Sequence, residues 1–131
     1  MRVLIDTHVF LWFISGPFRL SSLARETLEF RSSTALIRIA SLWEISIKSS
    51  MGNLDIAGGF SAVGKVQDEN NIEILPISFS HTLANHCLTF HHKDPFDRMI
   101  AAQAIDEGLD LISIDDAFDW YFADTEVKRI W

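Results

Sequence analysis

The sequence predicts a three-layer α/β/α protein, in which helices cover both faces of a central parallel sheet of four to five strands. Three observations predict this class. Apolar segments of strand length alternate with helical segments along the chain. The strand segments are nearly continuous apolar runs, as expected for strands that are buried on both faces. The 131 residues are the length of one ordinary domain, so we expect a single domain over residues 1–131.

The first half of the chain alternates strand and helix. Residues 2–6, RVLID, are a short buried strand that ends in an acid, and THVFLWFIS follows as a helix that Gly16 and Pro17 stop. The same patterns assign the rest of this half: an amphipathic helix at 21–30, a strand at 34–40, a helix at 41–51, a loop at 53–60 and a weakly patterned helix, FSAVGKVQDENN, after it.

The second half repeats the alternation. Its most strongly patterned helix is residues 95–107, which Asp94 and Pro95 open and Gly108 closes. The other segments are a strand at 72–77, a helix at 79–88, a strand at 109–114, a short helix at about 116–122 and a last strand in VKRIW.

Composition and charge exclude several classes of protein. Hydrophobic residues make up 48% of the chain and charged residues 22%, which excludes low-complexity disorder. The single cysteine, Cys87, excludes an internal disulfide and fits a reducing compartment. From its place on a predicted helix beside His86, we expect Cys87 in the core. Asp6 interrupts the apolar start, which has neither a signal-peptide layout nor the length of a membrane span, so we expect a cytoplasmic protein. With a net charge of -7, binding to nucleic acid would need a local basic rim or a bound metal.

Acidic residues follow three of the predicted strands. Asp6 ends the first strand, and Asp115 and Asp116 follow the fourth. Glu44 lies one turn into the helix after the second strand, and Asp97 heads the buried face of a later helix. Because the carboxyl ends of parallel strands meet at one edge of a sheet, where helix N-termini favour negative charge, we expect these acids to lie close together.

Each acid also has a local explanation as a helix cap. Asp6 precedes the first helix, and the acids after the fourth strand precede the short one. Ser41 and Glu44 have the spacing of a capping box, with Ser41 as the cap. Asp94 caps the helix that contains Asp97 in its first turn. The conjunction of all these acids at one sheet edge favours a shared site over independent caps.

Carboxylates gathered at one place repel one another unless a cation or protons offset their charge. Hard divalent cations prefer oxygen ligands and keep waters that a substrate can use. Neither the five histidines nor the single cysteine has the spacing of zinc ligands. The pattern therefore predicts a carboxylate site for Mg²⁺, with Mn²⁺ as the alternative.

Four segments of the chain carry a family resemblance. They are VLIDTHVFLW, SLWEISIKSSMGNL, HHKDPFDRMIAAQA and LISIDDAFDWY. In this order and at these separations they resemble the PIN-domain ribonucleases, and more narrowly the VapC-type toxins of prokaryotic toxin–antitoxin pairs, from residue 2 to about residue 122. The resemblance implies a PIN-like fold and a metal-dependent endoribonuclease that leaves 5′-phosphate and 3′-hydroxyl ends on RNA.

The resemblance also assigns the metal site. The implied metal-binding and catalytic residues are Asp6, Glu44, Asp97 and Asp115. Asp115 fits better than Asp116, because the family pattern places a hydroxyl residue two positions before the acid and Phe three positions after it. Ser113 and Phe118 fit those two positions, although Ser replaces the commoner Thr. Arg38 is unusual within the second strand and is expected to mark an edge or an interface.

Further residues are candidate contacts to the substrate or to a metal-bound water. They are Thr7, Ser41, Lys93, Arg98 and Asp116. The hydroxyls could bind the water or a ligand carboxylate, but both are equally ordinary at helix starts. The two cations, with His91 and His92 beside them, could meet phosphates, or could belong to a solvated loop in which Arg98 pairs with Asp94.

The resemblance further implies partners. Members usually form homodimers, and each pairs with a small VapB-like antitoxin whose tail fills the active site. The apolar, Trp-rich helices at 7–15 and 41–51 are where both contacts are expected.

Two other functions fit parts of the pattern. A receiver-like signalling module also binds Mg²⁺ in an acidic pocket, but it needs paired acids at the first strand end and an acceptor Asp after the middle strand. The first strand here ends in one acid, and IEILPI ends without one. A non-catalytic, RNA-binding PIN-like protein is the second alternative, against which the full set of acids argues.

Overall fold

A five-stranded parallel sheet forms the centre of the computed structural model, which describes residues 1–89 and 94–131. The strands lie in the order β3-β2-β1-β4-β5. Their bounds are β1 Arg2–Ile5, β2 Thr34–Arg38, β3 Glu73–Leu75, β4 Asp110–Ile112 and β5 Arg129–Ile130. The predicted parallel sheet is confirmed, and the C-terminal VKRIW segment supplies its last strand.

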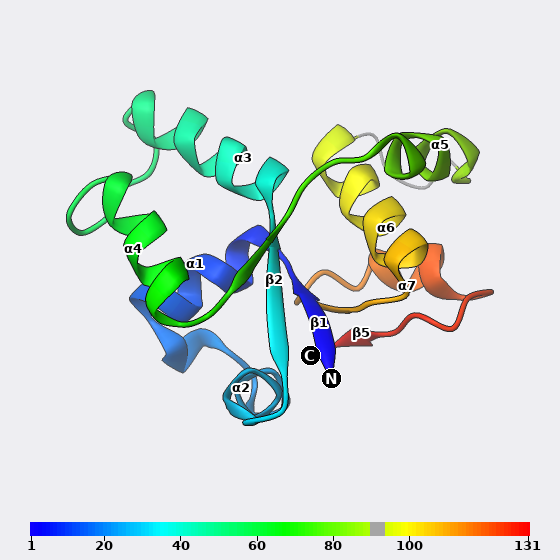
Figure 1. The fold of residues 1–131 in the computed structure, drawn as a ribbon, viewed down its shortest axis with the longest axis horizontal. Helices are drawn as coiled ribbons and strands as arrows, with labels where there is room; N and C mark the ends of the chain where they lie inside the picture. Colours follow the sequence, from blue (N-terminus) through cyan, green and yellow to red (C-terminus); the bar gives the residue numbers. More distant parts are fainter. Residues whose placement is uncertain (90–93) are drawn as a thin grey trace.

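Helices lie on both sides of this sheet (Figure 1). One side carries α1 (Thr7–Ser15), α2 (Ser22–Glu29), α3 (Ile39–Ser50) and α4 (Ser61–Glu69), with a short 3-10 helix at Pro17–Arg19 between the first two. The other side carries α5 (Phe79–Cys87), α6 (Pro95–Glu107) and α7 (Phe118–Phe122). The three-layer α/β/α architecture predicted from the sequence is therefore confirmed.

The alternation of side chains along the strands divides the core into two clusters. Leu4, Leu36 and Leu111 point to one face, where they join buried residues of α6 and α7. Ile5 and Ile37 point to the other face, where they join buried residues of α1, α2, α3 and α4. Apolar side chains are needed on both faces, which explains why the strands are nearly continuous apolar runs.

Some element ends differ from the prediction in ways that affect the site. Helix α3 begins at Ile39 rather than at Ser41, and Arg38 is its N-cap residue without a side-chain cap bond. The predicted capping box of Ser41 and Glu44 is therefore wrong, because Ser41 already lies within the first turn. Cys87, which we expected in the core, is exposed.

No membrane-spanning helix is found among the residues that the structure describes, because none of their helices is both long enough and apolar enough to cross a bilayer.

Candidate functional site

The carboxyl edge of the sheet brings three polar residues side by side. Ile5 of β1 pairs with Ile37 of β2 and with Ile112 of β4. The next residues along these strands are Asp6, Arg38 and Ser113, so the parallel register places them next to one another. This is the edge at which ligands bind in open α/β sheets.

Asp6 lies at the start of α1 and is held from two sides. Its Oδ1 accepts a hydrogen bond from the backbone N–H of His8 at 3.3 Å, so the predicted helix cap exists. Its Oδ2 accepts a hydrogen bond of 2.6 Å from the Ser113 hydroxyl, which is fully buried. The Ser113 Oγ in turn accepts from the backbone N–H of Asp115 at 3.1 Å. Ser113 therefore connects Asp6 with the loop that carries Asp115.

Glu44 reaches the same edge from the second turn of α3. Thr7 Oγ1 lies 3.0 Å from Glu44 Oε1 and 2.9 Å from Ser41 Oγ. Arg38 Nε donates to Ser41 Oγ at 3.2 Å. Because each hydroxyl has a single proton, the order that satisfies all three contacts is Arg38 to Ser41 to Thr7 to Glu44. Two hydroxyls thus link the guanidinium to the carboxylate, and Lys48 Nζ meets the other carboxylate oxygen at 3.4 Å.

Arg38 is the buried cation of this edge. Only 2% of the residue is exposed, and β2 lies between β1 and β3, so the expectation that Arg38 marks a sheet edge is wrong. Burial lowers the pKa of Arg38 to about 10, and the carboxylates of Asp6, Glu44, Asp97 and Asp94 act against that shift. The guanidinium is therefore charged at neutral pH and lies in the field of acids from separate elements.

Helix α6 brings Asp97 to this cation. Asp94 Oδ1 accepts from the Phe96 N–H at 2.8 Å, and Pro95 occupies the first turn, so the predicted cap is confirmed. Arg38 Nη1 donates to the Phe96 carbonyl oxygen at 3.1 Å. That bond fixes the end of β2 against the start of α6, where Asp97 lies in the first turn.

Asp115 and Asp116, in the loop after β4, lie in the electrostatic field of a second arginine, Arg129. The Asp115 Oδ1 accepts from the backbone N–H of Ala117 at 3.0 Å, although α7 begins only at Phe118. Arg129 pairs with Asp119 at 2.9 Å, and its Nη1 donates to the Ser113 carbonyl at 3.1 Å. The bond to Asp119 raises the pKa of Arg129, and the charges of Asp116 and Asp115 add to this effect.

The predicted substrate contacts have different outcomes. Thr7 and Ser41 lie at the acidic edge, where their hydroxyls bind each other and Thr7 also binds Glu44. Lys93 lies outside the described residues, as do His91 and His92. Arg98 donates to carbonyl oxygens at the end of α5, including that of Asn85 at 3.1 Å. The exposed side chain of Asp116 lies beside Asp115 in the loop after β4.

A groove opens beside these acids between the second half of α3 and the start of α6. Its lining residues are Glu44, Ile47, Lys48, Asp94, Pro95 and Phe96. At the side of the groove, the ring centroids of Trp43 and Phe96 are 5.7 Å apart. An extended ligand in this groove would pass the Glu44 carboxylate and an exposed ammonium.

The donor set of the edge fits a hard divalent cation. Asp6, Glu44 and Asp97 all act on one guanidinium, and Ser113 links Asp115 to Asp6. As the side chains lie, no three described acids of this edge have their oxygens within 4.8 Å of one another. Mg²⁺ keeps several of its waters and takes one or two carboxylates directly, so this wider spacing suits it.

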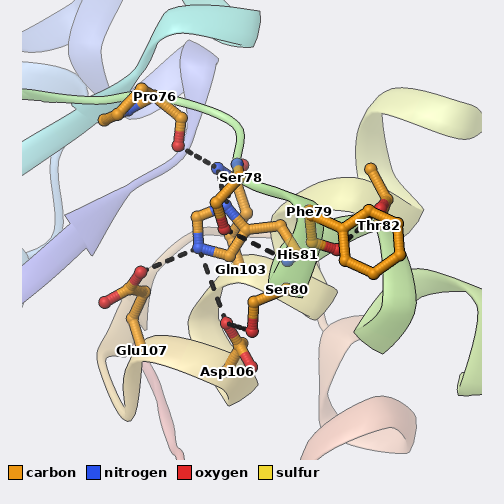
Figure 2. Close-up of polar contacts among 9 residues, drawn as sticks. All are labelled: Pro76, Ser78, Phe79, Ser80, His81, Thr82, Gln103, Asp106 and Glu107. Atoms are coloured by element: carbon orange, nitrogen blue, oxygen red, sulfur yellow. Dashed lines mark hydrogen bonds and ion pairs between the residues drawn. The ribbon is translucent and has the colours of Figure 1, made fainter.

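A second group of possible ligands lies at the other end of α6 (Figure 2). His81, Asp106 and Glu107 have ligand atoms that all lie within 4.8 Å of one another. Asp106 is nine residues beyond Asp97, or roughly 14 Å along the helix. Sequence reasoning missed this group, because its members come from two helices and have no spacing that marks a site.

The hydrogen bonds of His81 explain this group without a metal. The ring is 1% exposed, and its Nδ1 accepts from the Ser78 backbone N–H at 3.0 Å as part of a capping box. The ring proton therefore lies on Nε2, which is 2.8 Å from Glu107 Oε1. An ion at Nε2 would displace a proton that Nδ1 cannot take. We interpret the group as a link between α5 and α6.

The chain is similar to a known protein family and to solved structures. The family model described as PIN domain matches residues 3–121. No curated protein matches the chain. Solved structures with a similar fold include VapBC2 from Rickettsia felis bound to a DNA fragment from its promoter, at 16% identity and a TM-score of 0.76, with 100% of both chains covered.

Two further structures are similar at comparable levels. VapBC-1 from nontypeable Haemophilus influenzae has 14% identity and a TM-score of 0.72, with 98% of this chain and 96% of that chain covered. VapBC-5 from Mycobacterium tuberculosis has 18% identity and a TM-score of 0.66, with the same 98% and 96% covered. At these identities the likeness concerns the fold.

Proposed function

The chain belongs to the PIN domain family, and on that premise we propose that it is a Mg²⁺-dependent endoribonuclease, with Mn²⁺ as the alternative ion. We propose further that it leaves 5′-phosphate and 3′-hydroxyl ends and is the toxin of a type II toxin–antitoxin pair. One observation carries the proposal. The carboxylates of Asp6, Glu44 and Asp97, which come from separate parts of the chain, all raise the pKa of one buried guanidinium, that of Arg38, at the carboxyl edge of the sheet.

The proposed roles follow from the contacts of each side chain. Bound Mg²⁺ would supply an acidified water and offset the charge on the phosphoryl oxygens. The residues that would hold it are Asp6, Glu44, Asp97 and Asp115. Thr7 fixes one oxygen of Glu44, and Ser113 fixes one oxygen of Asp6. No nucleophilic side chain is needed.

RNA has to approach an acidic protein, whose net charge is -7. The groove beside Glu44 supplies a path, and the Lys48 side chain on its wall is 46% exposed. Phosphates in the groove would meet this ammonium beside Glu44. Lys93, Arg98 and Asp116 remain proposed substrate contacts.

The partners are part of the same proposal. All three structures carry the name VapBC, and one is described as a member of the VapBC family of toxin-antitoxin systems, which supports a VapB-like antitoxin for this chain. A homodimer is proposed through α1 and α3, since Trp43 of α3 is 61% exposed. A single domain over residues 1–131 and a cytoplasmic location complete the proposal.

An experiment can separate the proposed nuclease from one alternative function, RNA binding without catalysis. A non-catalytic RNA-binding PIN domain would bind RNA without cutting it. The receiver-like module is not proposed, because the PIN domain match spans residues 3–121.

The test compares RNA cleavage by four proteins in Mg²⁺ and in EDTA. Asp6→Asn and Asp97→Asn should each lower the rate by about a hundredfold or more, because each removes a charge that would hold the ion. Asp106→Asn is the matched control, since it changes an acid at the other end of α6. Equal cutting by all four proteins would point to a contaminating nuclease, and binding without cutting would support the non-catalytic alternative.

A further inference from the structure

Arg38 lies beneath the proposed metal site and cannot contact RNA itself. Only 2% of the residue is exposed, and its hydrogen bonds go to Ser41 Oγ at 3.2 Å and to the Phe96 carbonyl at 3.1 Å. These acceptors belong to α3 and α6, the helices that carry Glu44 and Asp97. One side chain of β2 therefore touches both helices that bring acids to the edge.

The Arg38 guanidinium is also connected to Glu44 by hydrogen bonds through two hydroxyl groups. Its Nε donates to Ser41, and the Ser41 and Thr7 hydroxyls continue the chain of donors to Glu44 Oε1 at 3.0 Å. Ser41 is fully buried and Thr7 is 6% exposed, so water does not screen the bond from Arg38 to Ser41 or the bond between Ser41 and Thr7. Hydrogen bonds in such a chain polarise one another.

Carboxylates at one edge repel, and something must offset their charge before an ion binds. An arginine suits this task because it keeps its charge in a buried place. Asp6 follows β1, Glu44 lies in α3 and Asp97 lies in α6, so their repulsion would push these elements apart. A cation among them acts against that separation.

We propose that Arg38 is a positioning residue of the acidic site: its guanidinium offsets the repulsion of Asp6, Glu44 and Asp97 when no metal is bound, and thereby lowers the affinity of the site for divalent cations. This inference rests on the proposed function, because it concerns the same carboxylates. The guanidinium and Mg²⁺ are both positive and are attracted to the same acids. The protein therefore folds without the ion and binds it more weakly than the acids alone would.

The test measures Mg²⁺ affinity by calorimetry in the wild type, Arg38→Met and Arg38→Lys. Met keeps an unbranched apolar side chain and removes the charge, so Mg²⁺ should bind about tenfold more tightly or better. Lys keeps the charge, so its affinity should stay near the wild type even if packing suffers. Arg2→Met is a control for net charge, because the exposed Arg2 pairs with Glu73. An affinity that is unchanged or weaker in Arg38→Met than in Arg38→Lys overturns the proposal.

A second measurement needs no metal. In EDTA, Glu44→Gln is introduced into the wild type and into Arg38→Met, and the melting temperatures give a double-mutant cycle. Glu44→Gln should lower the melting temperature of the wild type but lower it less, or raise it, in Arg38→Met, where it relieves repulsion. Equal shifts in both backgrounds overturn the proposal.

The two arms separate failure of this inference from failure of the proposed function. A wild type that takes up no Mg²⁺ would end the proposed metal site, yet the cycle in EDTA would still decide whether Arg38 holds the acids together. If Arg38→Met does not fold in EDTA, recovery of folded protein on addition of Mg²⁺ supports the proposal. Failure to recover in Mg²⁺ counts against it.

Discussion

At the scale of single residues, Ser113 shows how a buried hydroxyl organises charges that lie far apart along the chain. It donates to Asp6 at 2.6 Å and accepts from the Asp115 backbone at 3.1 Å, and it has no exposed surface. A residue in this place fixes one carboxylate oxygen of Asp6 and the path of the next loop. The geometry of two proposed metal ligands therefore depends on one side chain that does not itself belong to the ligand set.

We predict that Ser113→Ala lowers the free energy of unfolding by about 2 kcal/mol, because a buried hydrogen bond to a carboxylate is lost. Mg²⁺ affinity should fall severalfold, since Asp6 becomes free to rotate. Urea unfolding and calorimetry measure the two effects. The control is Ser46→Ala, whose hydroxyl donates to the Trp43 carbonyl on the outer side of α3. Unchanged Mg²⁺ affinity in Ser113→Ala would show that Asp6 needs no such support.

The sequence predicts residues poorly where their partners come from other elements. Asp94 could be identified as a cap, because its partner Phe96 is two residues away. Arg38 could not be placed, because its partners lie on α3 and α6 and no local pattern announces them. Ser41 fits a capping box in sequence, but α3 begins earlier, at Ile39. Hydrogen bonds between residues close in the chain can be predicted from the sequence. Hydrogen bonds between residues that only packing brings together cannot.

At the scale of elements, α5 and α6 are joined by a buried histidine. His81 accepts the Ser78 N–H at the start of α5 and meets Glu107 at the end of α6 (Figure 2). Gln103 of α6 also reaches its Nδ1, at 3.3 Å. Because α6 carries Asp97 at its other end, this link also holds the helix that brings an acid to the site.

Replacing this histidine should loosen the helix pair. We predict that His81→Phe lowers the free energy of unfolding by about 3 kcal/mol, because the Ser78 N–H loses its cap and buried polar groups lose a partner. His86→Phe, which changes an exposed residue of the same helix, should have little effect. Chemical unfolding of both variants measures the difference. Similar losses in the two variants would contradict the role given to His81.

Helix α3 presents an exposed apolar face opposite its buried one. Ile39, Trp43 and Ile47 follow one another at intervals of four residues and are 43%, 61% and 36% exposed. Residues at this spacing lie on one side of a helix. Such a stripe agrees with the proposed homodimer contact.

A charge in this stripe should weaken the dimer. We predict that Trp43→Glu changes the molar mass measured by light scattering from that of a dimer to that of a monomer. Trp120→Glu is the matched control, because Trp120 is 71% exposed on α7 and should leave the mass unchanged. A monomeric wild type, or a dimeric Trp43→Glu, would remove α3 from the proposed interface.

At the scale of the whole molecule, the topology concentrates negative charge at one edge. The order β3-β2-β1-β4-β5 places β1 between β2 and β4, so residues after these three strands become neighbours. This arrangement could be predicted in outline, because alternating apolar runs and helices favour a parallel sheet whose strand ends meet. The strand order and the cation among the acids could not be predicted, since they depend on register and packing.

The proposed function requires that the acids after β1, in α3, in α6 and in the loop after β4 form a single site for a divalent cation. Calorimetric titration with Mg²⁺ of the wild type, Asp97→Asn and Asp106→Asn tests it most directly. We predict that the wild type and Asp106→Asn bind the ion equally, while Asp97→Asn binds it at least about tenfold more weakly. Binding that survives Asp97→Asn and is lost in Asp106→Asn would contradict the claim and move the ion to the His81 group.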